Sequence, residues 1–448
     1  MNAFARRGAC PALSSPMPTG DGLLVRLNPL AGGFSPASLI ALCKAALQHG
    51  NGVVEVTARG SLQIRGLTPR SAALLARQVE GLGMVVRTGV PVEHGALAGL
   101  DPEEIADPRP LAASIREAAR QNGLDQRLGP KVSVVLDGGG HSGLGATAAD
   151  IRLMARRHCG EISWTFAIAG DARTAKPLAV LPDGRAAQAA IAGLEAVAAL
   201  GREGRGRDLD ARRRARLAAL LPPLVGAGSI APALAGGQRL VPSILPLRGG
   251  ASALAVAVPF GQMDADGVIG LAARAEEVRA SEIRLAPGRI MLALCPADAD
   301  ATALRQEAGR LGFVISPDDP RAGISACPGA PACASGRMPA RSLAALIAAA
   351  HGDILDGSLG LHVSGCAKGC ANPAKAPLAL VGGEDGAGLV VDGTARSVPL
   401  ARVPAEHALN SFGRLAGLIR AERRPGETSA ACVARLGTRC LAEAFEKG

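Results

Sequence analysis

Aromatic side chains are scarce in this chain of 448 residues, which contains no Tyr, one Trp and seven Phe. Proteins that bind single-stranded nucleic acid commonly stack the bases on aromatic side chains. The composition therefore argues against nucleic acid as a partner, although the net charge of +10 would by itself permit it. An acidic protein or a polycarboxylate ligand would suit the same positive charge.

The sequence also lacks a long uninterrupted apolar segment. Residues 1–22 carry Arg6 and Arg7 without an apolar run behind them, so we expect no secretory signal. The longest uncharged stretch, residues 217–238, would be long enough for a membrane span, but its Pro and Gly residues break a helix. We expect a cytoplasmic protein that does not enter a membrane. In that reducing compartment, clustered cysteines indicate a metal site before a disulfide.

A weak internal repeat divides the chain. The order strand, helix, strand at residues 22–66 recurs at residues 251–295, and an offset of 228 residues places Gly60 on Gly288. Each copy is followed by a helix and then a strand that ends in a Gly-rich turn.

This order predicts an α+β fold with a repeated pair of domains. Two ferredoxin-like half-domains would form a pseudo-twofold unit, and each would be followed by an α/β domain. The expected boundaries are residues 20–88 and 241–318 for the half-domains, and 89–240 and 319–448 for the α/β domains.

Four of the ten cysteines form two close pairs. Cys327 and Cys333 are separated by five residues, and Cys366 and Cys370 by three. A cubane cluster requires four thiolates, one on each iron atom. Gly and Pro keep both loops out of regular structure, so that backbone N–H groups can point at cluster sulfur atoms. The sequence therefore predicts a [4Fe–4S] cluster in the C-terminal domain. Zinc is the alternative metal, although zinc-binding cysteine pairs usually lie two to four residues apart.

Polar and apolar residues alternate from Val54 to Arg65, as in a strand with one buried face. The polar face carries Arg59, Gln63 and Arg65, whereas the matching face of the second copy keeps only Arg289 as a basic residue. A face needed only for solubility would not be expected to lose its charges in one copy. We therefore favour a ligand face over a solvent-facing strand, and a flat ligand rimmed by carboxylates, which guanidinium groups bind in pairs of hydrogen bonds.

Together, the cysteine spacing, the two half-domains and the Arg-bearing strand resemble the nitrite and sulfite reductase family, over about residues 20–381. This resemblance implies a cluster beside siroheme, with Cys370 bridging to the haem iron. It also matches Arg59 to an Arg of the family's strand motif, and Lys131 to the first of two lysines in an anion pocket. The second lysine is Ser133 in this chain, and an expected Arg is missing before residue 96. Siroheme-dependent reduction of sulfite or nitrite is therefore the less favoured alternative.

One branch of the family is more similar, in residues 7–26 and in both cysteine loops. Its members hydroxylate precorrin-3A, a metal-free tetrapyrrole, at C20 with O2 and close a γ-lactone in aerobic cobalamin biosynthesis. The resemblance implies a tetrapyrrole substrate, a mononuclear non-haem iron, and an external electron donor such as an NADH-linked reductase or a ferredoxin. A non-catalytic tetrapyrrole-binding or electron-transfer protein is the remaining alternative.

The resemblance gives expectations for the site but no catalytic residue. The tetrapyrrole-binding residues that we expect are Arg59, Gln63, Arg65 and Lys131. The cluster ligands are expected to be Cys327, Cys333, Cys366 and Cys370. The candidate ligands of the mononuclear iron are His94, His141 and His362.

Overall fold

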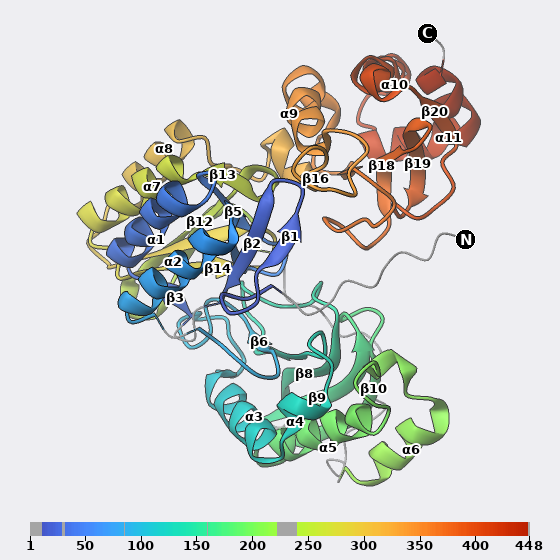
Figure 1. Ribbon diagram of the computed structural model, residues 1–448. Helices are drawn as coiled ribbons and strands as arrows, with labels where there is room; N and C mark the ends of the chain where they lie inside the picture. The colour runs from blue at the N-terminus through green and yellow to red at the C-terminus, as the bar shows by residue number, and fades with distance from the viewer. Residues whose placement is uncertain (1–10, 29–31, 85, 159, 222–239, 447–448) are drawn as a thin grey trace.

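The computed structural model describes residues 11–28, 32–84, 86–158, 160–221 and 240–446. These residues form a mixed α+β fold with four five-stranded sheets, drawn in Figure 1. The expected fold class is confirmed. The first ten residues and most of the uncharged stretch 217–238 lie outside the described residues. Within the described part, no helix is long and apolar enough to cross a membrane.

Two antiparallel sheets belong to the half-domains. The first has the strands β1 (Met17–Thr19), β2 (Gly22–Leu27), β5 (Leu62–Leu67), β4 (Val53–Val56) and β13 (Gln262–Asp264) in this order. The second has β11 (Ser243–Pro246), β12 (Ser252–Ala257), β15 (Ile290–Cys295), β14 (Glu282–Ala286) and β3 (Gly33–Phe34). Each sheet therefore takes one short edge strand from the other half of the repeat, since β13 pairs with β4 and β3 with β14.

Helices cover one face of these two sheets. They are α1 (Pro36–His49), α2 (Pro69–Gly81), α7 (Ala265–Glu277) and α8 (Ala301–Arg310). The sequence sets the start of α1, because the Ser35 hydroxyl accepts the Ser38 N–H and Pro36 occupies the first turn. Buried apolar residues of α1 and α7 belong to one shared core, so the two half-domains fold as a single unit.

The prediction of one continuous strand from Val54 to Arg65 is wrong, because β4 and β5 form a hairpin. Its turn is closed by the Thr57 N–H, which donates to the Ser61 carbonyl at 2.9 Å, and Gly60 has a φ of 76° that favours glycine. The second copy turns in the same way at Gly288, whose N–H donates to the Ala58 carbonyl at 3.0 Å. The two turns therefore touch, as two halves related by a pseudo-twofold axis would.

The other two sheets share one strand pattern, in which two parallel pairings are followed by two antiparallel ones. One sheet consists of β6 (Val92–His94), β7 (Val134–Asp137), β8 (Ala149–His158), β9 (Glu161–Gly170) and β10 (Lys176–Pro182). The other consists of β16 (Ile324–Ala326), β17 (Leu361–Ser364), β18 (Ala376–Gly383), β19 (Gly386–Gly393) and β20 (Ala401–Val403). The second pair of domains is therefore a repeat as well.

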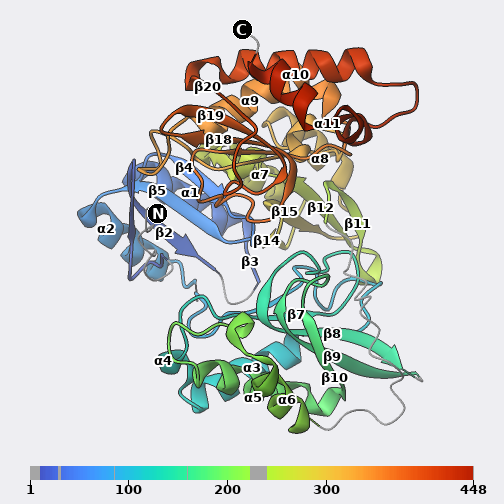
Figure 2. The ribbon, with the colours of Figure 1, turned by 90° about the vertical axis from the view of Figure 1, so that its right-hand side faces the viewer.

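Helices pack against each of these sheets. The first sheet has α3 (Arg109–Gln121), α4 (Leu124–Arg127), α5 (Ala186–Ala198) and α6 (Ala211–Ala219). The second has α9 (Ala340–His351), α10 (Ala408–Glu422) and α11 (Ser429–Glu446). Figure 2 shows the half-domain unit in the middle, with the first α/β domain below it and the C-terminal domain above. The expected boundaries near residues 88, 240 and 318 stay predictions.

Candidate functional site

The four predicted cluster cysteines line one cavity of about 660 Å³. All four are free thiols; Cys327 is buried, Cys333 and Cys366 are partly buried, and Cys370 is exposed. One cysteine loop follows β16 and the other follows its parallel neighbour β17. Because parallel strands end at the same edge of a sheet, the two loops meet there, where α/β sheets commonly bind ligands.

Glycines let the two cysteine loops approach each other closely. The Gly365 N–H donates to the Cys327 sulfur at 3.1 Å, and the Gly365 carbonyl accepts the Arg337 N–H at 2.7 Å. A Cβ on Gly365 would lie 2.8 Å from the Cα of Gly329, which is too close for any other residue. The loops thus form a cradle in which a backbone N–H already points at a cysteine sulfur.

The chemistry of this donor set fits a four-iron cluster. Burial raises the pKa of Cys366, the Lys368 N–H opposes this shift, and the charges of the other three thiols raise it further. Four thiolates so close together therefore need cations, and metal ions keep coordinating thiols deprotonated. Zinc would hold four sulfur atoms about 2.3 Å from one point. Among the described residues, no group of three or more Cys, His, Asp or Glu is arranged for a single ion.

The half-domain unit supplies the opposite wall of the cavity. Glu55 of β4 lies directly across from Gln63 of β5, and Arg65 follows on the same face. Their exposed fractions are only 5, 8 and 4%. In the orientation that satisfies the Gln63 amide, its nitrogen donates to Glu55 Oε2 at 3.1 Å and its oxygen accepts from Arg26 Nη2 at 2.8 Å. The polar face noted in the sequence is therefore buried against the cavity and does not face solvent.

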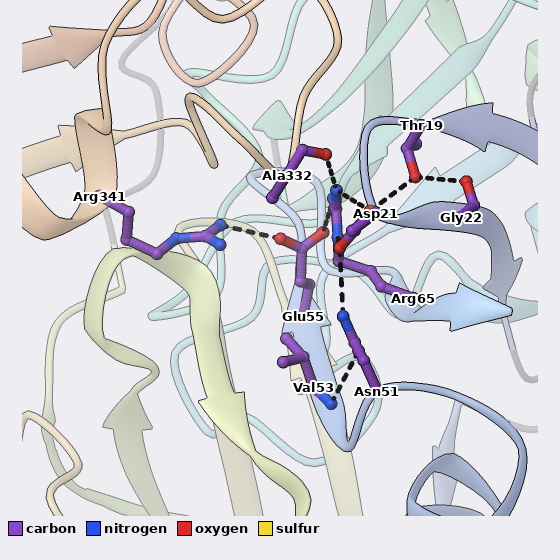
Figure 3. A network of polar contacts seen from close by, with 9 residues as sticks. All are labelled: Thr19, Asp21, Gly22, Asn51, Val53, Glu55, Arg65, Ala332 and Arg341. Carbon is purple, nitrogen blue, oxygen red and sulfur yellow. Dashed lines mark hydrogen bonds and ion pairs between the residues drawn. The ribbon is translucent and has the colours of Figure 1, made fainter.

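Arg65 joins this wall to the loop that carries Cys333 (Figure 3). All three nitrogens of its guanidinium donate to protein groups: to both Asp21 oxygens at 2.9 Å, to Glu55 Oε2 at 3.2 Å, and to the Ala332 carbonyl at 2.6 Å. Ala332 immediately precedes Cys333. The second oxygen of Glu55 accepts from Arg341 Nη2 at 2.8 Å. This ion-pair network spans two domains and fixes the position of the loop that carries Cys333.

Two of the expected tetrapyrrole-binding residues lie elsewhere. Arg59 is exposed in the turn between β4 and β5, and its Nη2 donates to the Ala148 carbonyl at 2.9 Å. Lys131 is exposed in a turn before β7. Neither side chain lines the cavity, whereas Gln63 and Arg65 line it together with the four cysteines.

The three histidines considered for a mononuclear iron are not gathered. His94 and His141 belong to the first α/β domain. The Nδ1 atom of His94 lies 3.0 Å from the Gly95 carbonyl, and that of His141 lies 2.9 Å from Asp101 Oδ1. His362 is buried on β17 of the C-terminal domain. These residues do not fit a common iron site, and we assign no step to such an iron.

Comparison with known proteins identifies the family. The family model of the nitrite/sulfite reductase ferredoxin-like half domain matches residues 15–82. The NirA protein of Mycobacterium tuberculosis superposes with a TM-score of 0.73 and 18% identity, over 94% of this chain and 84% of that chain. A precorrin-3B synthase of Sinorhizobium sp is 39% identical over the whole of this chain and 96% of its own length. The chain belongs to the precorrin-3B synthase family.

Membership of the precorrin-3B synthase family confirms the resemblance that the cysteine loops indicated. The likeness to NirA, at 18% identity, shows that this chain shares the fold of that protein. The match at residues 15–82 covers the first half-domain, which contributes Gln63 and Arg65 to the cavity.

Several cations of the cavity were not among the binding residues expected from the sequence, namely Arg26, Arg289, Arg341 and Lys368. One of them had a signal, because Arg26 lies in a strand that pairs with β5 directly opposite Gln63. Arg341 had none, since it reaches Glu55 from a position 286 residues away in the chain.

Proposed function

We propose that this chain is an oxygen-dependent monooxygenase that converts precorrin-3A into precorrin-3B. One atom of O2 enters the macrocycle as a hydroxyl group at C20. The ring A acetate closes a γ-lactone in the same conversion. The other atom leaves as water, with two electrons from an external NADH-linked reductase or ferredoxin. The observation that carries this proposal is a single cavity with four cysteines on one wall and arginines on the other.

The cations that line the cavity suit a substrate rimmed by carboxylates. Arg26, Arg289, Arg341 and Lys368 all line the cavity, against Glu55 as its acidic residue. A cavity of about 660 Å³ lies in the range of about 300–1,000 Å³ that is usual for ligand sites. In a partly enclosed site of this kind, charge-assisted hydrogen bonds are stronger than in water.

When bound, a [4Fe–4S] cluster supplies electrons one at a time. The chain's own residues hold it and prepare the site around it. The buried Cys327 and the glycine cradle keep water away from one side. Lys368 lies between Cys366 and Cys370, and its ammonium group donates to the Ser335 hydroxyl at 2.7 Å. This hydrogen bond holds the protonated ammonium group of Lys368 at the cysteine wall. The cytoplasm is the compartment that we propose, because thiols stay reduced there.

Replacing Arg26 with Gln should weaken binding of precorrin-3A by about 10- to 160-fold, because a hydrogen bond to a charged partner contributes about 1.5–3 kcal/mol. The cluster content should not change, since Arg26 lies on the wall opposite the cysteines. Fluorescence or optical titration with precorrin-3A measures the affinity. The matched control is Lys131→Gln, which removes an exposed charge outside the cavity and should leave the affinity unchanged. An equal loss of affinity in both variants would contradict this assignment of the binding wall.

The optical and EPR spectra of protein purified without oxygen test the cofactor part of the proposal. We expect a broad iron–sulfur absorption, an EPR signal of a reduced [4Fe–4S] cluster, and no haem bands. Sharp haem bands from bound siroheme would overturn the monooxygenase proposal in favour of a sulfite or nitrite reductase.

A further inference from the structure

His362 is a fully buried imidazole that lacks hydrogen-bond partners. It lies in β17, with 0% of its surface exposed, and neither ring nitrogen meets a partner within the described part of the chain. Its neighbours Leu361 and Val363 point into the apolar core under α9. Because successive side chains of a strand alternate, His362 points to the opposite side of the sheet. Burying two unpartnered polar atoms costs free energy, so a partner missing from the protein atoms is expected.

The edge of the ring that carries both nitrogens faces the second cysteine loop. A Cβ on Gly369 would lie 3.8 Å from the Cε1 atom of His362. Cε1 is the ring carbon bonded to both Nδ1 and Nε2, so both nitrogens lie close to this backbone. Gly369 directly precedes Cys370, and its φ of 60° is one that favours glycine. The unpartnered nitrogens are therefore aimed at the loop that would hold the cluster.

The charge state of the ring suits a hydrogen bond to sulfur. Burial lowers the pKa of His362 to about 4, and the positive charge of Arg289 lowers it further. Arg289 itself donates to the Ala371 carbonyl at 2.9 Å, just beyond Cys370. A neutral imidazole keeps one N–H donor, which can point at a thiolate or sulfide without adding a buried charge.

We propose that His362 donates a hydrogen bond to a sulfur atom of the [4Fe–4S] cluster beside Cys370 and thereby raises the reduction potential of the cluster. This inference rests on the cluster of the proposed function, and it makes His362 a positioning residue of the redox centre. A hydrogen bond to a cluster sulfur stabilises the more negative, reduced state. Removing it should make reduction about tenfold less favourable, which is 59 mV for one electron.

Pulsed EPR on the reduced full-length protein tests the contact directly. In protein labelled with ¹⁵N-histidine, we expect a weak ¹⁵N coupling to the cluster spin, of the size that a hydrogen-bonded ring gives. His362→Leu should lose this coupling and show a lower midpoint potential in an EPR-monitored titration. His362→Gln keeps an N–H donor and should retain a potential close to that of the wild type. His141→Leu removes a histidine of the other α/β domain and should change neither property.

The outcomes separate this inference from the function on which it rests. A normal cluster signal in the wild-type protein without any histidine ¹⁵N coupling would overturn the hydrogen bond and leave the proposed function standing. A wild-type protein that contains no cluster would overturn both. The labelled wild-type measurement needs no variant, so it decides the question even if His362→Leu fails to fold.

Discussion

Replacing Cys327 with Ala should remove the proposed [4Fe–4S] cluster and lower oxygen-dependent turnover by more than about 100-fold, which is the upper end of the cost of losing an outer-shell partner. Cys327 is buried between the two cysteine loops, and its sulfur accepts the Gly365 N–H at 3.1 Å. No other cysteine of the described residues lines this cavity besides the four proposed ligands. A substitute thiolate is therefore not at hand. Iron and sulfide analysis with EPR measures the cluster content.

The matched control is Cys440→Ala, which removes an exposed free thiol from α11. Its cluster content and turnover should equal those of the wild type. A full cluster in the Cys327 variant, or equal cluster loss in both variants, would contradict the assignment of Cys327 as a ligand.

Replacing Arg65 with Met should destabilise the protein by about 3–5 kcal/mol, the usual cost of removing one partner from a buried ion pair. The substitution leaves the buried Glu55 carboxylate without one of its two cations and frees the Ala332 carbonyl beside Cys333. We therefore expect a lower free energy of unfolding in urea and also poorer retention of the cluster.

The control for Arg65 is Arg127→Met, which breaks the surface pair with Glu195, where the two side chains are 48 and 35% exposed. Exposed pairs contribute about 0–1 kcal/mol, so this variant should unfold almost like the wild type. Equal stability of the two variants would mean that the interdomain network does not hold the half-domain to the cluster loop.

The effect of Arg65→Met should also depend on pH. Burial alone would raise the pKa of Asp21, but the hydrogen bond and charge of Arg65, with the Thr19 hydroxyl, hold it below 3.8. A carboxyl group whose pKa falls on folding stabilises the folded state above its unfolded pKa and loses this contribution as the pH falls through the folded value. The difference in unfolding free energy between variant and wild type should be full at pH 7 and shrink below about pH 4.

The sequence predicts that the four cysteines lie together, and local information suffices for this prediction because each pair lies within one short loop. Two cysteine pairs and the glycines between them lie in short loops, and the strands that precede both loops are adjacent and parallel. The repeat was also visible, since strand and helix patterns recur at a fixed offset. The half-domain sheets were less predictable, because the exchanged strands β3 and β13 have only two and three residues.

The opposite wall of the cavity could be predicted only in part. Gln63 and Arg65 reach it through the alternation of β5, although a hairpin, and not one long strand, brings Gln63 opposite Glu55 and the Arg65 side chain beside it. Arg59 does not line the cavity, because it falls in the turn between β4 and β5, where alternation no longer sets the direction of a side chain. Arg341 depends on contact between distant domains, and no local pattern encodes that contact.

Turnover with ¹⁸O2 tests the central proposal most directly. The reconstituted enzyme would be incubated with precorrin-3A, an electron donor and ¹⁸O2, and the product analysed by mass spectrometry. We expect a single tetrapyrrole product that contains one ¹⁸O atom and a γ-lactone, formed only when the cluster is present. Unchanged precorrin-3A under these conditions, or a product whose new oxygen comes from water, would contradict the monooxygenase function.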